Sequence, residues 1–319
     1  MDRKKFSWTV LARYTPYIIL LILCAAMTFA TDNFLSLSNV VSVLRQSSFL
    51  LVMAVGMSFA MILGRGADMS LGATVAISSC LAAPFLRESR GLGSIIFGFA
   101  LAIGIGVIIG AVNGALIAYL RLPALLVTYG MSNILRGTIY SHMEGSVVTN
   151  LHRSVMFLGS GFVGEIPVPI IIAALVTLLS VFILKKMPAG RRLYVVGANA
   201  EAARFSGIKS NQTIILGFVL TSAIAAMAGL MYIGRLGTAE AQIGTEFHLN
   251  AIAAAAIGGV SFNGGIANLG GVVAGAIILS LLTNGMNLMN ISSDWQGFIN
   301  GAIIILAVLV DYFSNRRNR

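Results

Sequence analysis

The run SIIFGFALAIGIGVIIGAVNGALIAYL, residues 94–120, decides the fold class of this chain. It has 27 consecutive residues without a charged side chain, whereas an α-helix needs about 20 mostly apolar residues to cross a hydrocarbon core of ~30 Å. Seven further apolar runs lie at residues 15–30, 47–63, 69–86, 168–184, 212–232, 269–289 and 297–313. The sequence therefore predicts an all-α integral membrane protein.

The composition leads to the same conclusion. The chain has 319 residues, of which 57% are hydrophobic and 10% are charged, and its mean hydropathy is +0.91. A soluble domain has about 25% charged residues, so a water-soluble globule is excluded. Ten membrane helices would use about 200 residues, which leaves no room for a large soluble domain. Residues 1–319 are expected to form a single transmembrane domain.

Charge asymmetry settles the number of helices that hydropathy leaves open. Two weaker segments lie at residues 123–140, which contain Asn133 and Arg136, and at residues 248–263, which are rich in Ala and Gly. Lys and Arg accumulate in cytoplasmic loops, so the basic start of the chain, its basic tail and the basic loop 185–211 are all expected inside. That placement requires both weak segments to cross the membrane, and re-entrant segments at these two positions are the alternative. The prediction is about ten spans with both termini cytoplasmic.

A short internal similarity accompanies the ten-helix prediction. Asp68-Met-Ser-Leu-Gly-Ala73 and Glu246-Phe-His-Leu-Asn-Ala251 share the pattern acid-x-x-Leu-x-Ala, and each precedes a predicted helix. A five-helix offset would place the two halves in opposite orientation, as in many transporters. An inverted five-helix repeat and a chance similarity both fit this pattern.

Several classes of activity are disfavoured by what the sequence contains. The net charge of +10 comes from bases scattered over short loops and tails, not from the contiguous patch that nucleic acid requires. None of the lysines follows a glycine, so there is no P-loop, and the three histidines lack metal-ligand spacing. No Asp or Glu falls inside a membrane segment of this topology, which argues against ion coupling. We expect no catalytic residue, metal or cofactor on this chain, and ATP to be bound by a partner chain.

Small residues recur every four positions on two of the predicted helices. They are Gly106, Gly110 and Gly114 on one helix and Gly271 and Gly275 on another. Such spacing lets a neighbouring helix backbone approach closely. The spacing differs from that of a dinucleotide-binding loop, and no strand is predicted before it. We therefore interpret these glycines as helix-packing positions.

Polar side chains within the apolar segments are candidates for a translocation path, because lipid offers them no hydrogen-bond partner. The candidates are Asn113, Thr128, Ser132, Asn133, Arg136, Asn284 and Asn287, and the same reasoning includes Gln46 and Asn250. Thr128, Ser132 and Arg136 recur at i, i+4 and i+8 and share one helix face. Hydroxyl and amide groups suit a polyol or sugar. Hydrogen bonding between helices is the alternative, and Arg136 fits either mid-membrane or the outer interface.

The basic loop at residues 185–211 contains the signals of a short helix. Asn199 is a favourable N-cap, Glu201 lies in the first turn, and Gly207 is placed to end the helix. A helix of this length is not stable alone. It is expected to pack on its own bundle or to dock into a soluble partner protein.

Several motifs together resemble the membrane permeases of bacterial ribose-type sugar ABC importers. They run in order over nearly the whole chain, at residues 68–72, 110–114, 122–130, 135–137, 191–208, 249–260, 264–265 and 284–296. The resemblance implies a non-catalytic permease subunit in the bacterial cytoplasmic (inner) membrane. It also implies a second permease copy or paralogue, dimeric ATP-binding cassette ATPase subunits and an extracytoplasmic solute-binding protein as partners.

In that family the segment from Asn199 to Gly207 resembles a coupling helix that contacts the ATPase. The resemblance assigns this role to Asn199, Glu201, Ala202, Ala203, Arg204 and Gly207. The expected cargo is a monosaccharide or a similar polyhydroxylated solute. Departures at Gly66-Ala-Asp-Met-Ser-Leu-Gly72 and Tyr129 leave other cargo open, such as a branched amino acid or a sugar-derived signal. An ion-coupled secondary carrier is the remaining alternative.

Overall fold

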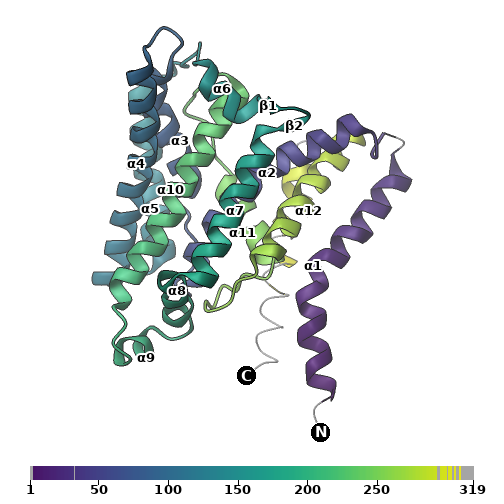
Figure 1. The fold of residues 1–319 in the computed structure, drawn as a ribbon, viewed down its shortest axis with the longest axis vertical. Helices are drawn as coiled ribbons and strands as arrows, with labels where there is room; N and C mark the ends of the chain where they lie inside the picture. Colours follow the sequence, from purple (N-terminus) through teal and green to yellow (C-terminus); the bar gives the residue numbers. More distant parts are fainter. Residues whose placement is uncertain are drawn as a thin grey trace.

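A computed structural model describes residues 3–31, 33–292, 295–299, 301–303, 305–306 and 309. In this part of the chain, helices lie side by side with most of their axes along the long direction of the molecule (Figure 1). The helices are α1 (Arg3–Ala30), α2 (Leu37–Ile62), α3 (Leu71–Ala82), α4 (Leu92–Tyr119), α5 (Ala124–Met143), α6 (Arg153–Ser160), α7 (Val168–Lys186), α8 (Pro188–Ala198), α9 (Ala200–Phe205), α10 (Ser210–Leu236), α11 (Phe247–Ile257) and α12 (Leu269–Leu288). A 3-10 turn, η1 (Ala83–Leu86), extends α3, and β1 (Phe162–Val163) pairs antiparallel with β2 (Ile166–Pro167).

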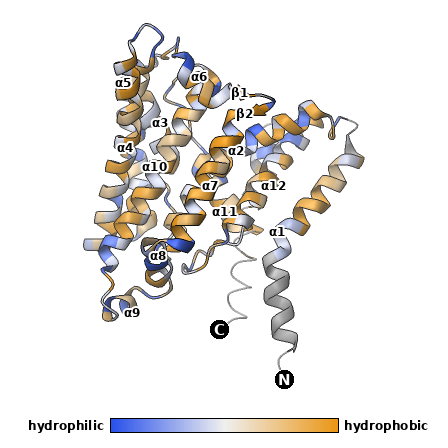
Figure 2. Ribbon diagram, in the orientation of Figure 1, coloured by the Kyte–Doolittle hydropathy of each residue, from blue (hydrophilic) through white to orange (hydrophobic). Residues whose placement is uncertain are grey.

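The predicted class of a helical membrane protein is confirmed. Five helices, α2, α4, α7, α10 and α12, are long and apolar enough to cross a membrane. Shorter apolar helices cover Tyr14–Phe29, Leu71–Leu86 and Phe247–Ile257. Hydrophobic residues follow the shafts of these helices, while hydrophilic residues gather at their ends and in α8 and α9 (Figure 2).

Both weak sequence segments contain helices, but one is shorter than predicted. The segment 123–140 forms α5, whereas the segment 248–263 is helical only to Ile257. Gly258 and Gly259 follow, and Gly259 has a φ of +85°, a conformation that ends a helix. At 1.5 Å per residue, the 11 residues of α11 extend about 16 Å, roughly half of a hydrocarbon core. Of the predicted tenth segment, 297–313, the structure describes residues 297–299, 301–303, 305–306 and 309.

The glycine-rich faces bring helix backbones together. Gly106 and Gly114 of α4 lie against α10, where a Cβ on Gly106 would come within 2.5 Å of the Ser222 carbonyl oxygen. A Cβ on Gly114 would be 2.6 Å from the Ile215 Cα. Gly271 and Gly275 of α12 lie in the same way against the backbone of α11. These glycines therefore set the distance between helices in both halves of the chain.

Two ends of the molecule carry different short elements. α8 and α9 lie at the end where α1 begins, whereas α6 and the β1–β2 hairpin lie at the opposite end (Figure 1). Residues 185–211 were expected to form one short helix within a loop, but Pro188 and Asn199 divide the segment into α8 and α9. Pro188 occupies the first helical position of α8, where its missing N–H costs nothing.

The glycine contacts predict a difference between two positions on α4. Gly110→Ala places a methyl group against the Phe218 carbonyl and should cost about 1–3 kcal/mol of stability through overpacking. Gly104→Ala is the matched control, because nothing lies within 4 Å of a Cβ at that position. The midpoint of thermal unfolding in detergent should fall for Gly110→Ala alone. Equal midpoints would contradict the close α4–α10 packing.

Candidate functional site

The helix α9 has the ends that the sequence predicts. The Oδ1 atom of Asn199 accepts hydrogen bonds from the backbone N–H groups of Glu201, at 3.0 Å, and Ala202, at 2.9 Å. At the other end Gly207 has a φ of +78°, and the Ile208 N–H donates to the Ala203 carbonyl at 3.0 Å. An N-cap and a glycine stop therefore fix this six-residue helix.

α9 rests on the bundle through two alanine side chains, Ala203 and the half-buried Ala200. Ala203 is buried, whereas Glu201 and Arg204 are exposed and Phe205 is 79% exposed. The Arg204 guanidinium lies 5.8 Å from the centre of the Phe205 ring. One acid, one base and one aromatic ring thus project from the end of the molecule. Phe205 was not among the predicted coupling residues, because the sequence around it does not show whether its ring faces the bundle or the solvent.

A buried polar cluster lies where α3 begins. Oδ1 of Asp68 accepts hydrogen bonds from the Ser70 backbone N–H, at 2.8 Å, and the Ser70 hydroxyl, at 2.6 Å. Nδ2 of Asn113 on α4 donates to the same hydroxyl at 2.9 Å. The Met69 N–H donates to Oγ1 of Thr128 on α5 at 3.0 Å. The cluster therefore joins the start of α3 to two neighbouring helices.

Asp68 corrects one prediction. The sequence predicts no Asp or Glu inside a membrane segment, and Asp68 precedes α3, but its side chain is completely buried in the bundle. The reason is that the connection from α2 to α3 turns into the bundle, so that the acid lies beside the positive end of α3. Oδ2 of Asp68 and Oδ1 of Asn113 have no hydrogen-bond partner among the described residues. One buried carboxylate therefore lies beside the start of α3, and the prediction against ion coupling stays untested.

The polar stripe of α5 faces the connections that precede α3 and α11. Thr128 and Ser132 are buried. Arg136 is half-buried, and its Nη2 and Nη1 donate to the Gly244 carbonyl at 3.2 Å and to Oγ1 of Thr245 at 3.4 Å. All three residues lie on the predicted face of α5. Thr128 and Arg136 form hydrogen bonds to the connections before α3 and α11 of the same chain.

The other path candidates have separate partners. Asn284 exchanges two amide hydrogen bonds with Asn39 of α2, at 2.8 and 3.2 Å. Asn133 is exposed and donates to the Tyr129 carbonyl, while Oδ1 of the exposed Asn287 accepts a bond from Gln296. The seven predicted path residues therefore fall into groups with different hydrogen-bond partners, and their role in a path stays a prediction.

A cavity of about 190 Å³ lies between α2, α10, α11 and α12. Three aromatic rings line one part of it. The ring centres of Phe49 and Tyr232 are 5.9 Å apart, and those of Tyr232 and Phe247 are 4.8 Å apart. The Arg235 guanidinium lies 5.3 Å from the Phe49 ring centre. The remaining lining residues are Gln46, Leu50, Met53, Asn250, Leu279, Ser280 and Thr283.

Only some of the residues that line this cavity were predicted from the sequence. Gln46 and Asn250 were recognised as polar residues in apolar segments, and the structure brings them together from α2 and α11. The three aromatic residues were missed, because single aromatic residues within apolar helices are typical of any core. Their proximity depends on contacts between helices far apart in the sequence.

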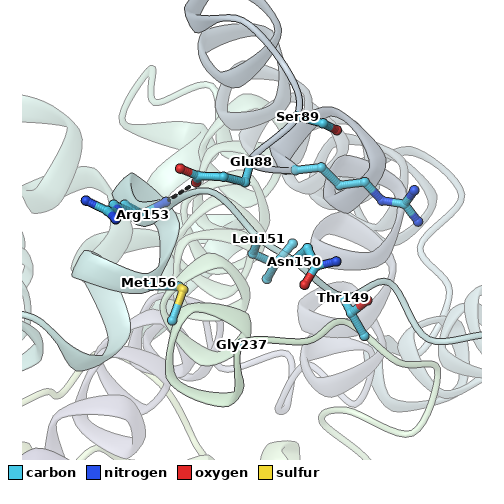
Figure 3. A pocket seen from close by; sticks show the side chains of 9 residues that line it. Glu88, Ser89, Thr149, Asn150, Leu151, Arg153, Met156 and Gly237 are labelled. Atoms are coloured by element: carbon cyan, nitrogen blue, oxygen red, sulfur yellow. Dashed lines mark hydrogen bonds between the residues drawn. The ribbon is translucent and has the colours of Figure 1, made fainter.

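A second, shallow depression of about 710 Å³ lies beside α6, which is at the end opposite α9 (Figure 1), and is drawn in Figure 3. Its lining includes charged and polar side chains from two connections and from α6, such as Arg87, Asn150 and Arg153, together with Leu151 and Met156. The Glu88 carboxylate accepts a hydrogen bond from the Arg153 backbone N–H at 3.0 Å, drawn as a dashed line in Figure 3. This end of the molecule therefore offers a polar surface of mixed charge.

Comparisons with known proteins give consistent matches. The family described as "Branched-chain amino acid transport system / permease component" matches residues 39–308. The chain is 35% identical over 314 residues to the ribose import permease protein of Escherichia coli (strain K12), covering 97% of this chain and 96% of that protein.

Two further relatives extend the comparison. The chain is 34% identical over 310 residues to the ribose import permease protein of Bacillus subtilis (strain 168), covering 95% of this chain and 93% of that one. It is 32% identical over 332 residues to the galactose/methyl galactoside import permease protein of Escherichia coli (strain K12), covering 99% and 98%. No solved structure matches the chain.

The buried cluster predicts that one hydroxyl matters more than its neighbours. Ser70→Ala should lower stability by about 1–3 kcal/mol, because the Asn113 amide loses its partner while remaining buried. Ser79→Ala is the control, since that buried hydroxyl bonds only to carbonyls of its own helix. Thermal unfolding of both purified variants measures the difference. If Ser79→Ala were the more damaging of the two, the cluster would not hold α3 in place.

Proposed function

The chain belongs to the family of branched-chain amino acid transport system permease components, and on this premise we propose that it is the membrane-spanning permease subunit of an ATP-driven importer of a monosaccharide. Its cargo is a monosaccharide or a similar polyhydroxylated solute delivered by an extracytoplasmic binding protein. The observation that carries this proposal is the similarity to ribose and galactose import permeases, which extends over nearly the whole chain. The family description mentions branched-chain amino acids, but these full-length relatives favour a sugar.

The proposed topology has ten spans in the bacterial cytoplasmic membrane, with both termini in the cytoplasm. Two observations support it. The basic helix α8 and the adjoining α9 lie at the end where α1 begins (Figure 1). The short helices α3 and α11 also meet at their starts, since a Cβ on Gly72 would touch the Gly244 carbonyl and a Cβ on Gly244 would touch the Gly72 carbonyl. The two starts therefore lie against each other, and an inverted five-helix repeat stays part of the proposed topology.

The energy is supplied by ATPase subunits on separate chains, and this chain makes or breaks no bond in its cargo. α9 is the proposed docking element, because Glu201, Arg204 and Phe205 project from the bundle. The shallow depression of mixed charge at the opposite end suits the binding protein. A second permease copy or paralogue completes the path.

α10 gives a direct route from the docking helix to the bundle interior. The Ser210 hydroxyl at the start of α10 donates to the Ala200 carbonyl of α9 at 3.0 Å. The 27 residues of α10 extend about 40 Å, and Tyr232 and Arg235 near its other end line the cavity. Movement of α9 during the ATP cycle would therefore reach the cavity through one continuous helix.

An ion-coupled secondary carrier is the rival function. It needs a test because the bundle contains a buried acid, Asp68. Uptake into liposomes that contain this chain alone and an ion gradient would support that rival. Uptake that requires ATP, the ATPase and the binding protein supports the importer.

The docking role predicts the effect of reversing charge on α9. The double variant Glu201→Lys, Arg204→Glu should lose co-purified ATPase and sugar uptake, because like charges facing each other at an interface cost several kcal/mol. Glu165→Lys is the control, since that residue is exposed in the β1–β2 turn at the opposite end. Full ATPase recovery with the double variant would refute the docking role.

A further inference from the structure

The cavity between α2, α10, α11 and α12 contains polar side chains without protein partners. Among the described residues, the side chains of Gln46, Asn250 and Ser280 and the guanidinium of Arg235 make no hydrogen bond to the protein. These groups provide both donors and acceptors. Gln46 and Asn250 are half-buried and Arg235 is exposed, so these groups are open to water or to a ligand.

Aromatic rings lie next to these unpaired groups. Tyr232 stands between Phe49 and Phe247 in edge-to-face contacts. All three come from different helices, so their proximity is a property of the packing rather than of one helix face. A sugar ring has apolar C–H surfaces and polar hydroxyl groups at its rim, and this cavity offers aromatic and hydrogen-bonding groups side by side.

The size and charge of the cavity limit the ligand. Drug-sized ligands occupy pockets of roughly 300–1,000 Å³, whereas this cavity measures about 190 Å³, which suits a single sugar ring. None of its lining residues is acidic, and its one charged group is the Arg235 guanidinium. The cavity therefore disfavours a cationic solute such as an amine.

We propose that this cavity is a binding site for one neutral monosaccharide within the permease itself, with Gln46 and Asn250 as hydrogen-bonding residues and Tyr232 as the aromatic contact. This inference rests on the proposed transport of a sugar and adds that the permease recognises its cargo. The site combines the start of α11 with the end of α10. Movement of either helix would change its shape, which couples recognition to the ATP cycle.

The test measures sugar binding to the full permease chain in lipid nanodiscs by saturation-transfer NMR, with D-ribose, D-galactose and maltose as probes. Gln46→Met and Asn250→Leu keep the side-chain size and remove the amide. Each should weaken monosaccharide binding by about three- to tenfold, the loss of one hydrogen bond. Tyr232→Leu should reduce saturation transfer to the ring protons. Maltose, which has two rings, should not bind.

Gln242→Met is the matched control, because Gln242 is exposed and lies outside the cavity. Thermal unfolding of each variant checks that the fold is retained. The absence of monosaccharide binding to the wild type, or equal binding by the control and both amide variants, would overturn the site. ATP-dependent sugar uptake by the wild-type chain with its ATPase and binding protein is measured in parallel. Failure of uptake would refute the proposed function, whereas normal uptake with unchanged binding would refute the site alone.

Discussion

The structure depends on one constraint, which is that backbone polar groups within a hydrocarbon layer must find partners inside the protein. Long helices meet this requirement alone. The connections before α3 and α11 interrupt the helices, so side chains must bond their backbone. Thr128 accepts from the Met69 N–H, and Arg136 donates to the Gly244 carbonyl. The polar stripe of α5 thus supports two broken helices that meet through Gly72 and Gly244.

This constraint explains how much could be predicted from the sequence. The helix over residues 94–120 was predictable because its apolar length leaves one outcome, and α9 was predictable because Asn199 and Gly207 mark its ends. The stripe of α5 was recognised as polar, but its partners could not be known. They lie in connections whose path into the bundle depends on tertiary contacts. Asp68 was misplaced for the same reason, because short polar connections are usually exposed.

The candidate site was less predictable than the fold. Gln46 and Asn250 were conspicuous because amides are rare within apolar helices. Phe49, Tyr232 and Phe247 gave no signal, because only the packing of α2, α10 and α11 brings them together. Gly56 of α2 lets this helix approach α10, since a Cβ there would be 3.3 Å from the Thr221 carbonyl oxygen. α10 therefore belongs both to the rigid core and to the connection between α9 and the cavity.

The orientation of the bundle is the central claim, because α9 must face the ATPase and the mixed-charge depression must face the binding protein. Single cysteines at Ser206, beside α9, and Ser89, at the opposite end, test it directly in a chain whose two native cysteines are replaced. A membrane-impermeant maleimide should label Ser206→Cys only in inverted vesicles and Ser89→Cys only in spheroplasts. Labelling of Ser206→Cys from outside the cell would contradict the account.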